Sequence, residues 1–274
     1  GGLRGVPGVL CDTSRVLPDQ GLILRGRPVF ELKDMAPEAV FFLLLSGELP
    51  TDQELRDFQI ELGQRSVVPR QVWRVLETMP SHSHPMSMLS VGLLALDAYG
   101  HFKRRYEEGM HRDEYWEAAY EDTLDIVAKL PSIAAYIYRL TFDKGPRIQG
   151  DPDLPIANNY AYMLGYEKNG VFADLMRLYL VLHSDHGGGN VSAFTTHTVG
   201  SALSNPYLAL SAGLNGLAGP LHGLANQECL RWILSLMNRY GGVPSAEQVR
   251  EHAQWTLDQG RVVPGYGHAV LRDT

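Results

Sequence analysis

The sequence predicts a mainly α-helical protein, and three observations support this fold class. Apolar residues between positions 172 and 182 share one face of a helix, at spacings of three and four residues. Thr51 with Glu54, and Ser245 with Gln248, form capping boxes that mark the starts of two further helices. Proline or glycine punctuates nearly every junction between the expected helices, and no alternation of strand and helix predicts a parallel sheet.

The expected elements follow in chain order. Residues 9–24 contain short β-branched or apolar stretches that are interrupted by aspartate, proline and glycine, which indicates a small hairpin or an irregular arm. The two capping boxes open helices that run to Arg65 and towards Gly260. The remaining helices are expected near 36–46, 69–79, 85–99, 113–129, 131–141, 170–184, 192–203, 206–215 and 224–240. Composition marks no clear domain boundary, and the glycine-rich stretch 213–223 is the best hinge candidate.

Composition and charge limit the possible partners. The 274 residues are 45% hydrophobic, which suits one large domain or two modest ones. A formal charge of -7 gives no general attraction to nucleic acid or anionic membranes, so local arginines would have to hold an anionic ligand. The two cysteines lie among apolar neighbours, which favours buried thiols in a reducing compartment. No apolar stretch approaches the ~20 residues of a membrane span, and residues 1–5 lack the apolar segment of a signal peptide.

The first candidate site is the segment from His183 through His186 to Asn190 and Ser192, at the end of the helix expected over 170–184. The three glycines that follow His186 let the backbone approach a ligand closely. A helix C-cap with a buried histidine would also fit. A cation shared by His183 and His186 is a third interpretation, but no third ligand with suitable spacing follows. We favour a pocket for a polar ligand.

The second candidate site surrounds His222, which lies between Pro220 and Gly223 just before a predicted helix. The positive end of a helix dipole disfavours the imidazolium form, so His222 is expected to be neutral at pH 7. A neutral imidazole can still donate an N–H to a carbonyl oxygen on which negative charge develops. A histidine that only caps a turn is the alternative.

The third candidate site runs from Val262 to His268. Its glycines leave backbone N–H and C=O groups accessible, which suits recognition of a planar ring by the main chain. Arg261 and Arg272 flank the segment and could contact phosphates. A surface β-turn would explain the same pattern. Three histidines in glycine-rich turns at helix ends are nevertheless an unusual arrangement for stability alone.

These three motifs resemble the citrate synthase family, and more closely its mitochondrial-type sequences, which some bacteria also carry. The matching stretches are 183–192, 219–228 and 262–272, and the likeness covers essentially the whole chain. It includes Leu24–Gly26, His84–Ser87, Arg112–Glu117, Lys129–Pro131, Met176–Tyr179 and Gly200–Ser204. Motifs of this length are highly specific.

The resemblance implies a citrate synthase fold, with a large helical domain over 1–222 and the first part of a smaller mobile domain over 223–274. Oxaloacetate would bind in the cleft between them and drive closure, which builds the acetyl-CoA site. Acetyl-CoA and oxaloacetate would then condense to citryl-CoA, which is hydrolysed to citrate and CoA. The resemblance also implies a homodimer. We expect no tightly bound cofactor, no metal, and neither nucleic acid nor membrane as a partner.

The resemblance also assigns roles. His222 would donate to the thioester oxygen while a carboxylate of the family removes the methyl proton, and His268 would polarise the ketone of oxaloacetate. His186 would hold a carboxylate of oxaloacetate, and Asn190 would contribute to the same subsite. Ser192 and His183 would contact the substrate-binding residues rather than the substrate, and Ser192 would orient His222. Coenzyme A would be held by Val262, Val263, Gly265, Tyr266 and Gly267, with Arg25, Arg112 and Arg272 near its phosphates.

Some features depart from the family pattern. Phe194 stands where many relatives of this type have histidine, which could alter the polarity of the pocket. The resemblance places the family's catalytic aspartate and carboxylate-binding arginines beyond Thr274, and its N-terminal helices before Gly1. The expectation is therefore a stretch truncated at both ends that is by itself inactive, because loss of a general base alone costs ~10²–10⁴-fold in rate.

Two other functions stay open. A 2-methylcitrate synthase that uses propionyl-CoA would share the chemistry. A non-catalytic protein of the same fold that binds CoA or organic acids would explain the absent aspartate, although the three intact histidine motifs count against it. The expected location is the mitochondrial matrix or the bacterial cytoplasm, and secretion is not expected.

Overall fold

The computed structural model describes residues 8, 10–17 and 19–266. The chain begins with a small antiparallel sheet of strands β1 (Ser14–Leu17), β2 (Gly21–Leu24) and β3 (Arg27–Pro28), in the order β1-β2-β3. Arg25 and Gly26 turn the chain between β2 and β3, with φ of 45° and 81°. The expected hairpin is therefore confirmed.

The sheet is anchored on the helices that lead to the first candidate site. Helices α1 (Val29–Leu32) and α2 (Pro37–Ser46) follow β3, and α9 (Val171–Leu182) lies against them. Leu24, Val40, Leu43 and Val181 are fully buried in one cluster. This apolar contact fixes the hairpin beside the C-terminal end of α9.

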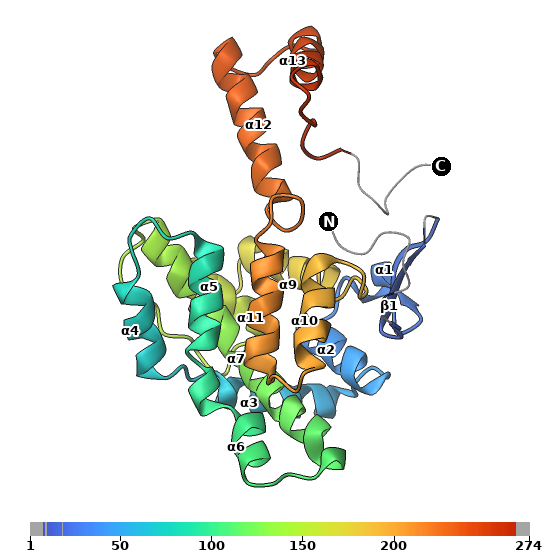
Figure 1. Cartoon of the computed structure of the whole chain (residues 1–274), viewed down its shortest axis with the longest axis vertical. Coiled ribbons are helices and arrows are strands. Elements are labelled where there is room, and N and C mark those ends of the chain that lie inside the picture. The colour runs from blue at the N-terminus through green and yellow to red at the C-terminus, as the bar shows by residue number, and fades with distance from the viewer. Residues whose placement is uncertain (1–7, 9, 18, 267–274) are drawn as a thin grey trace.

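The body is built of helices that pack around α7 (Figure 1). Besides α1, α2 and α9, the body contains α3 (Asp52–Arg65), α4 (Arg70–Thr78), α5 (Pro85–Leu94), α6 (His101–Glu107), α7 (Tyr115–Thr141), α8 (Ile156–Leu164), α10 (Val191–Gly200) and α11 (Pro206–Leu217), with short 3₁₀ turns η1 (Asp97–Tyr99) and η2 (Arg112–Glu114). Val72, Leu76, Leu93, Ile133 and Tyr207 form the largest buried cluster, between α4, α5, α7 and α11. The prediction of a mainly α-helical fold is confirmed.

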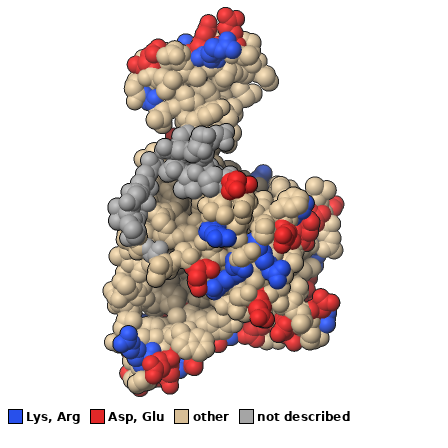
Figure 2. Space-filling model, turned by 90° about the vertical axis from the view of Figure 1, so that its right-hand side faces the viewer, with Lys and Arg blue, Asp and Glu red and all other residues tan. Residues whose placement is uncertain are grey.

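Helices α12 (Ala225–Tyr240) and α13 (Ala246–Asp258) project from the body as a pair (Figures 1 and 2). Trp232 Nε1 on α12 donates to Thr256 Oγ1 on α13 at 3.0 Å, and the ring of His252 lies between those of Trp232 and Trp255. Ile233, Leu234 and Trp255 on this pair are exposed. The division of the chain into two domains at residue 222 stays a prediction.

Two sequence predictions were wrong in detail. The helices expected over 113–129 and 131–141 are one helix, α7, with Pro131 inside it. A proline removes one backbone donor, and burial of Ala128, Ile133 and Ala135 on either side offsets that loss. Helices α1, α6 and α8 were not predicted from the sequence. Helix α8 has its first amide, that of Ile156, held at 2.7 Å by Glu38 Oε1 on α2, a contact that no local pattern reveals.

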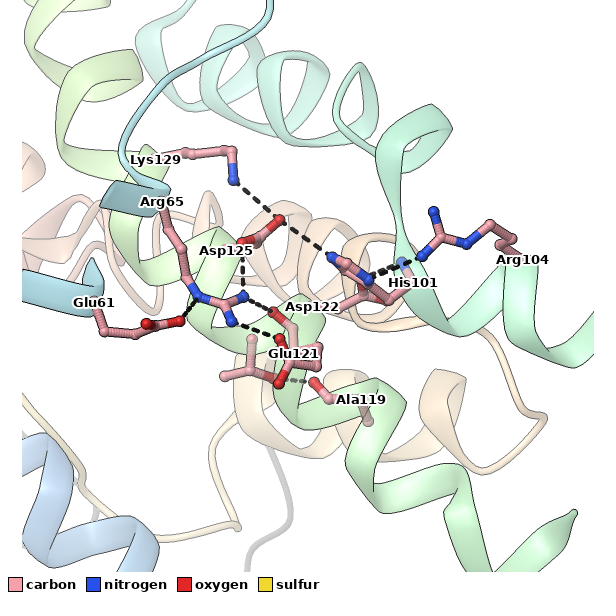
Figure 3. Close-up of polar contacts among 10 residues, drawn as sticks. Glu61, Arg65, His101, Arg104, Ala119, Glu121, Asp122, Asp125 and Lys129 are labelled. Carbon is pink, nitrogen blue, oxygen red and sulfur yellow. Dashed lines mark hydrogen bonds and ion pairs between the residues drawn. The ribbon is translucent and has the colours of Figure 1, made fainter. Parts of the chain in front are cut away.

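A network of charges joins α3, α6 and α7 at the base of the body (Figure 3). The Arg65 guanidinium contacts Glu61 at 2.5 Å, Glu121 at 2.6 Å and Asp125 at 3.0 Å. Lys129 Nζ lies 3.0 Å from Asp125, on its other side. The network supplies partners for Glu121, Asp125 and Lys129 on α7, which the packing has partly removed from water.

Among the described residues, no helix is both long enough and apolar enough to cross a membrane. The face of the molecule seen in Figure 2 carries acidic and basic side chains intermingled, so no extended field of one sign covers it.

Candidate active site

The first candidate site forms a loop between α9 and α10. His183 closes α9 as its C-cap residue, and its ring stacks on Tyr179 with centroids 4.1 Å apart. His183 Nδ1 lies 2.8 Å from the carbonyl oxygen of Tyr179, which can only accept, so this nitrogen carries a proton. The other ring nitrogen, Nε2, is then the acceptor of a neutral imidazole. The side chain of His186 is exposed and has no hydrogen-bond partner among the described residues, which leaves it available to a ligand.

The N-terminal hairpin fixes this loop through two residues that the sequence analysis missed. Thr13 Oγ1 donates a hydrogen bond to Asp185 Oδ2. The other carboxylate oxygen, Asp185 Oδ1, accepts the amide of Gly187 at 3.0 Å, and Gly187 has φ of 79°. Aspartate two residues before a glycine is a recognisable turn signal, but its partner lies 172 residues away in the sequence.

Asn190 is the N-cap of α10 and organises the residues after the glycines. Its Oδ1 accepts the amide of Ala193 at 2.9 Å, while its Nδ2 donates to the carbonyl of Gly187 at 3.1 Å. These two contacts orient the side-chain amide, and Ser192 Oγ also lies 2.7 Å from Oδ1. Asn190 therefore supports the loop, whereas its predicted contact with oxaloacetate stays a prediction.

The structure brings the first and second candidate sites together. His222 Nε2 lies 2.9 Å from Ser192 Oγ and 3.4 Å from the backbone amide nitrogen of Ser192. The Ser192 hydroxyl has a single proton, which both His222 and Asn190 can accept. The backbone amide of Ser192 can only donate, so His222 Nε2 accepts from it and Nδ1 carries the ring proton. Ser192 can thus select the tautomer of His222.

His222 lies on a turn that precedes α12, with its amide donating to the carbonyl of Gly219 at 3.0 Å. Partial burial lowers the pKa of His222 below its ordinary value, because it disfavours the charged imidazolium. The helix dipole favours the same neutral form. A neutral imidazole here has one N–H to offer to a substrate oxygen.

Glycines in α11 allow the turn that carries His222 to approach α10. A Cβ at Gly213 would lie within contact distance of Thr196 Oγ1 and 2.9 Å from the carbonyl oxygen of Ser192. A Cβ at Gly216 would lie 2.9 Å from Val191 Cγ1. Both glycines therefore serve close helix packing, and the hinge expected within 213–223 stays a prediction.

The third candidate site is described only in part. The backbone of residues 261–266 is irregular, with Val262 and Tyr266 exposed and Val263 half-buried. Gly265 has φ of 93° and rests on α12, where a Cβ would lie 3.1 Å from Cys229 Sγ. Gly267, His268 and Arg272 lie outside the described residues.

The two described arginines expected near the CoA phosphates lie in different surroundings. The guanidinium of Arg25 is held by the carbonyl of Leu44, at 2.8 and 3.1 Å, and by Asp12 at 3.1 Å. Arg112 begins the η2 turn after α6, and α6 lies at the opposite end of the body from α12 and α13 (Figure 1). A single chain therefore does not bring Arg112 close to Val262 and Tyr266.

No group of three or more His, Cys, Asp or Glu side chains suited to a metal occurs within residues 8, 10–17 and 19–266. The described site thus consists of the exposed imidazole of His186, the neutral imidazole of His222, the Ser192 hydroxyl that contacts His222, and the Asn190 amide that contacts Ser192.

Comparison with known proteins agrees with this geometry. Residues 2–274 match the family described as citrate synthase, C-terminal domain. The mitochondrial citrate synthases of Saccharomyces cerevisiae and Xiphias gladius are 48% and 47% identical to the chain, which they cover fully. The citrate synthase of Pyrobaculum aerophilum superposes with a TM-score of 0.82 at 28% identity, over 96% of this chain and 64% of that one.

The fold and the paired histidine loops thus define a helical protein of the citrate synthase architecture. The chain belongs to the citrate synthase family. It spans 59% and 61% of the length of the two mitochondrial relatives.

Proposed function

We propose that the chain carries the enol-stabilising half of the active site of a citrate synthase, an acyltransferase that condenses acetyl-CoA with oxaloacetate to give citrate and CoA. The observation that carries the proposal is the neutral His222 held 2.9 Å from Ser192 Oγ. The names of the mitochondrial relatives support the same reaction.

The proposed chemistry at His222 follows from its tautomer. With Nε2 accepting from Ser192, Nδ1–H is free to donate to the thioester oxygen of acetyl-CoA. As the methyl group loses a proton, negative charge grows on that oxygen, and the donated hydrogen bond strengthens. A neutral donor suits this task, because it stabilises the enol without losing its own proton at neutral pH.

The remaining roles in oxaloacetate binding are also proposals. His186 would hold a carboxylate of oxaloacetate, since its exposed ring has no partner among the described residues. Asn190 would position that subsite, and His268 would polarise the ketone. Citryl-CoA would form by attack of the enol carbon on this ketone, and water would then release citrate and CoA.

We further propose that Arg25 and the Val262–Tyr266 segment hold CoA. A phosphate would take the place of Asp12 at the guanidinium of Arg25, because the Asp12 side chain is 88% exposed and is easily displaced. Arg112 could join this group only from another copy of the chain, which supports a homodimer. The mitochondrial relatives favour the mitochondrial matrix as the location, with a bacterial cytoplasm as the alternative.

We infer that residues 1–274 alone turn over slowly, because no carboxylate contacts His222 among the described residues. A missing base can be replaced by a small carboxylate in solution. We therefore expect citrate formation by the chain to be weak and to rise with added acetate, in an assay that follows release of the CoA thiol.

The control variant is His82→Ala, since His82 is exposed in a turn and makes no side-chain hydrogen bond among the described residues. His222→Ala should abolish the acetate-dependent rate, whereas His82→Ala should preserve it. Ordinary turnover without acetate would refute the inference about the base. No acetate-dependent rate, together with no binding of oxaloacetate by calorimetry, would refute the proposed function. Propionyl-CoA in the same assay distinguishes a 2-methylcitrate synthase.

A further inference from the structure

A cavity lies away from the histidine loops, between α4, α7 and the segment that contains Arg147. Its volume is about 660 Å³, which is in the range of pockets that hold small molecules. Helix α4 lies on the opposite flank of the body from the β1–β2 hairpin (Figure 1). We call this cavity the α4–α7 groove.

Three arginines line the α4–α7 groove. Arg70 and Arg74 are four residues apart on α4 and thus share one helix face, and Arg147 faces them from beyond the end of α7. Within the described part of the chain, none of the three makes an ion pair or a side-chain hydrogen bond. Arg65, by contrast, contacts three carboxylates. Three uncompensated guanidinium groups around one cavity are unexpected in a chain of net charge -7.

The wall of the groove holds one of these arginines in place. The guanidinium carbon of Arg147 lies 4.7 Å from the ring centroid of Trp73, a cation–π contact. Trp73 packs edge-on against Tyr136, with centroids 5.4 Å apart. Arg147 is therefore positioned before any ligand arrives, which reduces the entropy lost on binding.

Among the residues that the structure describes, one acidic side chain lines the groove, and it accepts a hydrogen bond. Glu77 Oε1 accepts a hydrogen bond from Tyr136 Oη at 2.9 Å. Burial, together with the charge of Glu77, raises the pKa of Tyr136 to about 12, so this phenol keeps its proton and continues to donate at neutral pH. Three positive charges thus face one negative charge, that of Glu77.

We propose that the α4–α7 groove binds a small polyanion of the diphosphate or triphosphate class. The planar fork of a guanidinium matches two phosphate oxygens at once, and at least two negative charges are needed to balance the groove. The indole of Trp73 is only 9% exposed and is covered by Arg147, so it offers little surface for stacking a base. The polyphosphate is therefore the recognised part of the ligand.

Calorimetry with inorganic triphosphate, ADP and adenosine tests the proposal at low ionic strength. Triphosphate and ADP should bind the unmodified chain with similar affinity, and adenosine should not bind. Arg74→Gln and Arg147→Gln should each weaken triphosphate binding about tenfold, as expected for loss of a charge-assisted contact. Arg250→Gln is the matched control, because Arg250 is an exposed helical arginine on α13, and it should leave binding unchanged.

Absence of saturable triphosphate binding would overturn the proposal. Equal weakening of binding by Arg250→Gln would also overturn it, because it would indicate general charge attraction. Triphosphate binding that neither Arg74→Gln nor Arg147→Gln weakens would overturn it too, and would assign the bound triphosphate to the proposed CoA residues. Adenosine binding that Arg74→Gln or Arg147→Gln weakens would contradict the recognition chemistry, because it would place a base rather than a polyphosphate in the groove. Light scattering measures the oligomeric state of each variant. If Arg74→Gln changed it, the groove would be a contact between copies of the chain, and the proposal would be overturned. Each result is independent of whether the chain makes citrate.

Discussion

The substitution Gly213→Ala tests whether the closeness of α10 and α11 maintains the site. The added methyl group would enter the space occupied by Thr196 Oγ1 and would lie 2.9 Å from the carbonyl oxygen of Ser192. Thr196 cannot simply turn away, because its hydroxyl donates to that same carbonyl at 2.9 Å. Helix α10 must therefore shift, and Ser192 must shift with it.

The expected loss follows from two opposing terms. Inserting a methyl group into a packed interior costs ~1–3 kcal/mol, and contact with a backbone atom favours the upper part of that range. Alanine in place of glycine inside a helix returns about 1 kcal/mol. The free energy of unfolding should therefore fall by ~1–2 kcal/mol, which lowers the melting temperature by roughly 3–6 °C in a chain of this size.

Gly200→Ala on α10 is the matched control. A Cβ there would lie 3.9 Å from Ala209 Cβ, an ordinary contact, so this variant should be as stable as the parent or slightly more stable. Denaturant unfolding measures both variants. In nitrogen-labelled samples, Gly213→Ala should also change the ring signals of His222, and Gly200→Ala should not. If Gly213→Ala were as stable as Gly200→Ala, the packing argument would be refuted.

Three further substitutions probe other contacts. Arg65→Met should reduce the free energy of unfolding by ~2 kcal/mol, less than for a fully buried ion pair because the partners of Arg65 are partly exposed. The control Arg56→Met, on the exposed face of α3, should change the free energy of unfolding by less than about 0.5 kcal/mol, and equal losses for both variants in denaturant unfolding would contradict this prediction. Thr13→Val should speed amide exchange at Gly187 about five- to tenfold, because the hydrogen bond from Thr13 to Asp185 is lost. Unchanged exchange would show that the hairpin does not position this loop. Burial raises the pKa of Glu38, so the unfolded chain releases this proton first and stability falls as pH rises towards the folded pKa. Glu38→Gln should therefore flatten the decline in stability that begins at the ordinary glutamate pKa of about 4.3, and an unaltered pH profile would show that Glu38 contributes nothing to it.

Local patterns predicted most of the helices, because their signals lie within a few residues. The capping boxes at Thr51 and Ser245 begin α3 and α13 as expected. Where a distant contact decides the outcome, the sequence was insufficient. Pro131 suggested a break that tertiary burial overrides, and α8 depends on Glu38 from another helix.

The same distinction applies to the site. The motif containing Ser192 and that containing His222 were each recognisable, and the contact between them, 30 residues apart, was inferred from family resemblance. The contact between Thr13 and Asp185 crosses 172 residues, and neither residue type is distinctive enough to reveal it. The need for Gly213 inside α11 was also missed, because glycine in a sequence does not distinguish close packing from a hinge.

The projecting pair α12–α13 has a thermodynamic consequence. Its buried contacts are few, and they involve mainly the two helices themselves, around Trp232, His252 and Thr256. Such a pair forms a separate cooperative unit, whose opening requires less free energy than opening of the body. Its amides should therefore exchange first, and a protease should cleave near residues 218–224 before it attacks α7. The segment that carries His222 thus lies on the boundary between a rigid and a readily unfolding part of one chain.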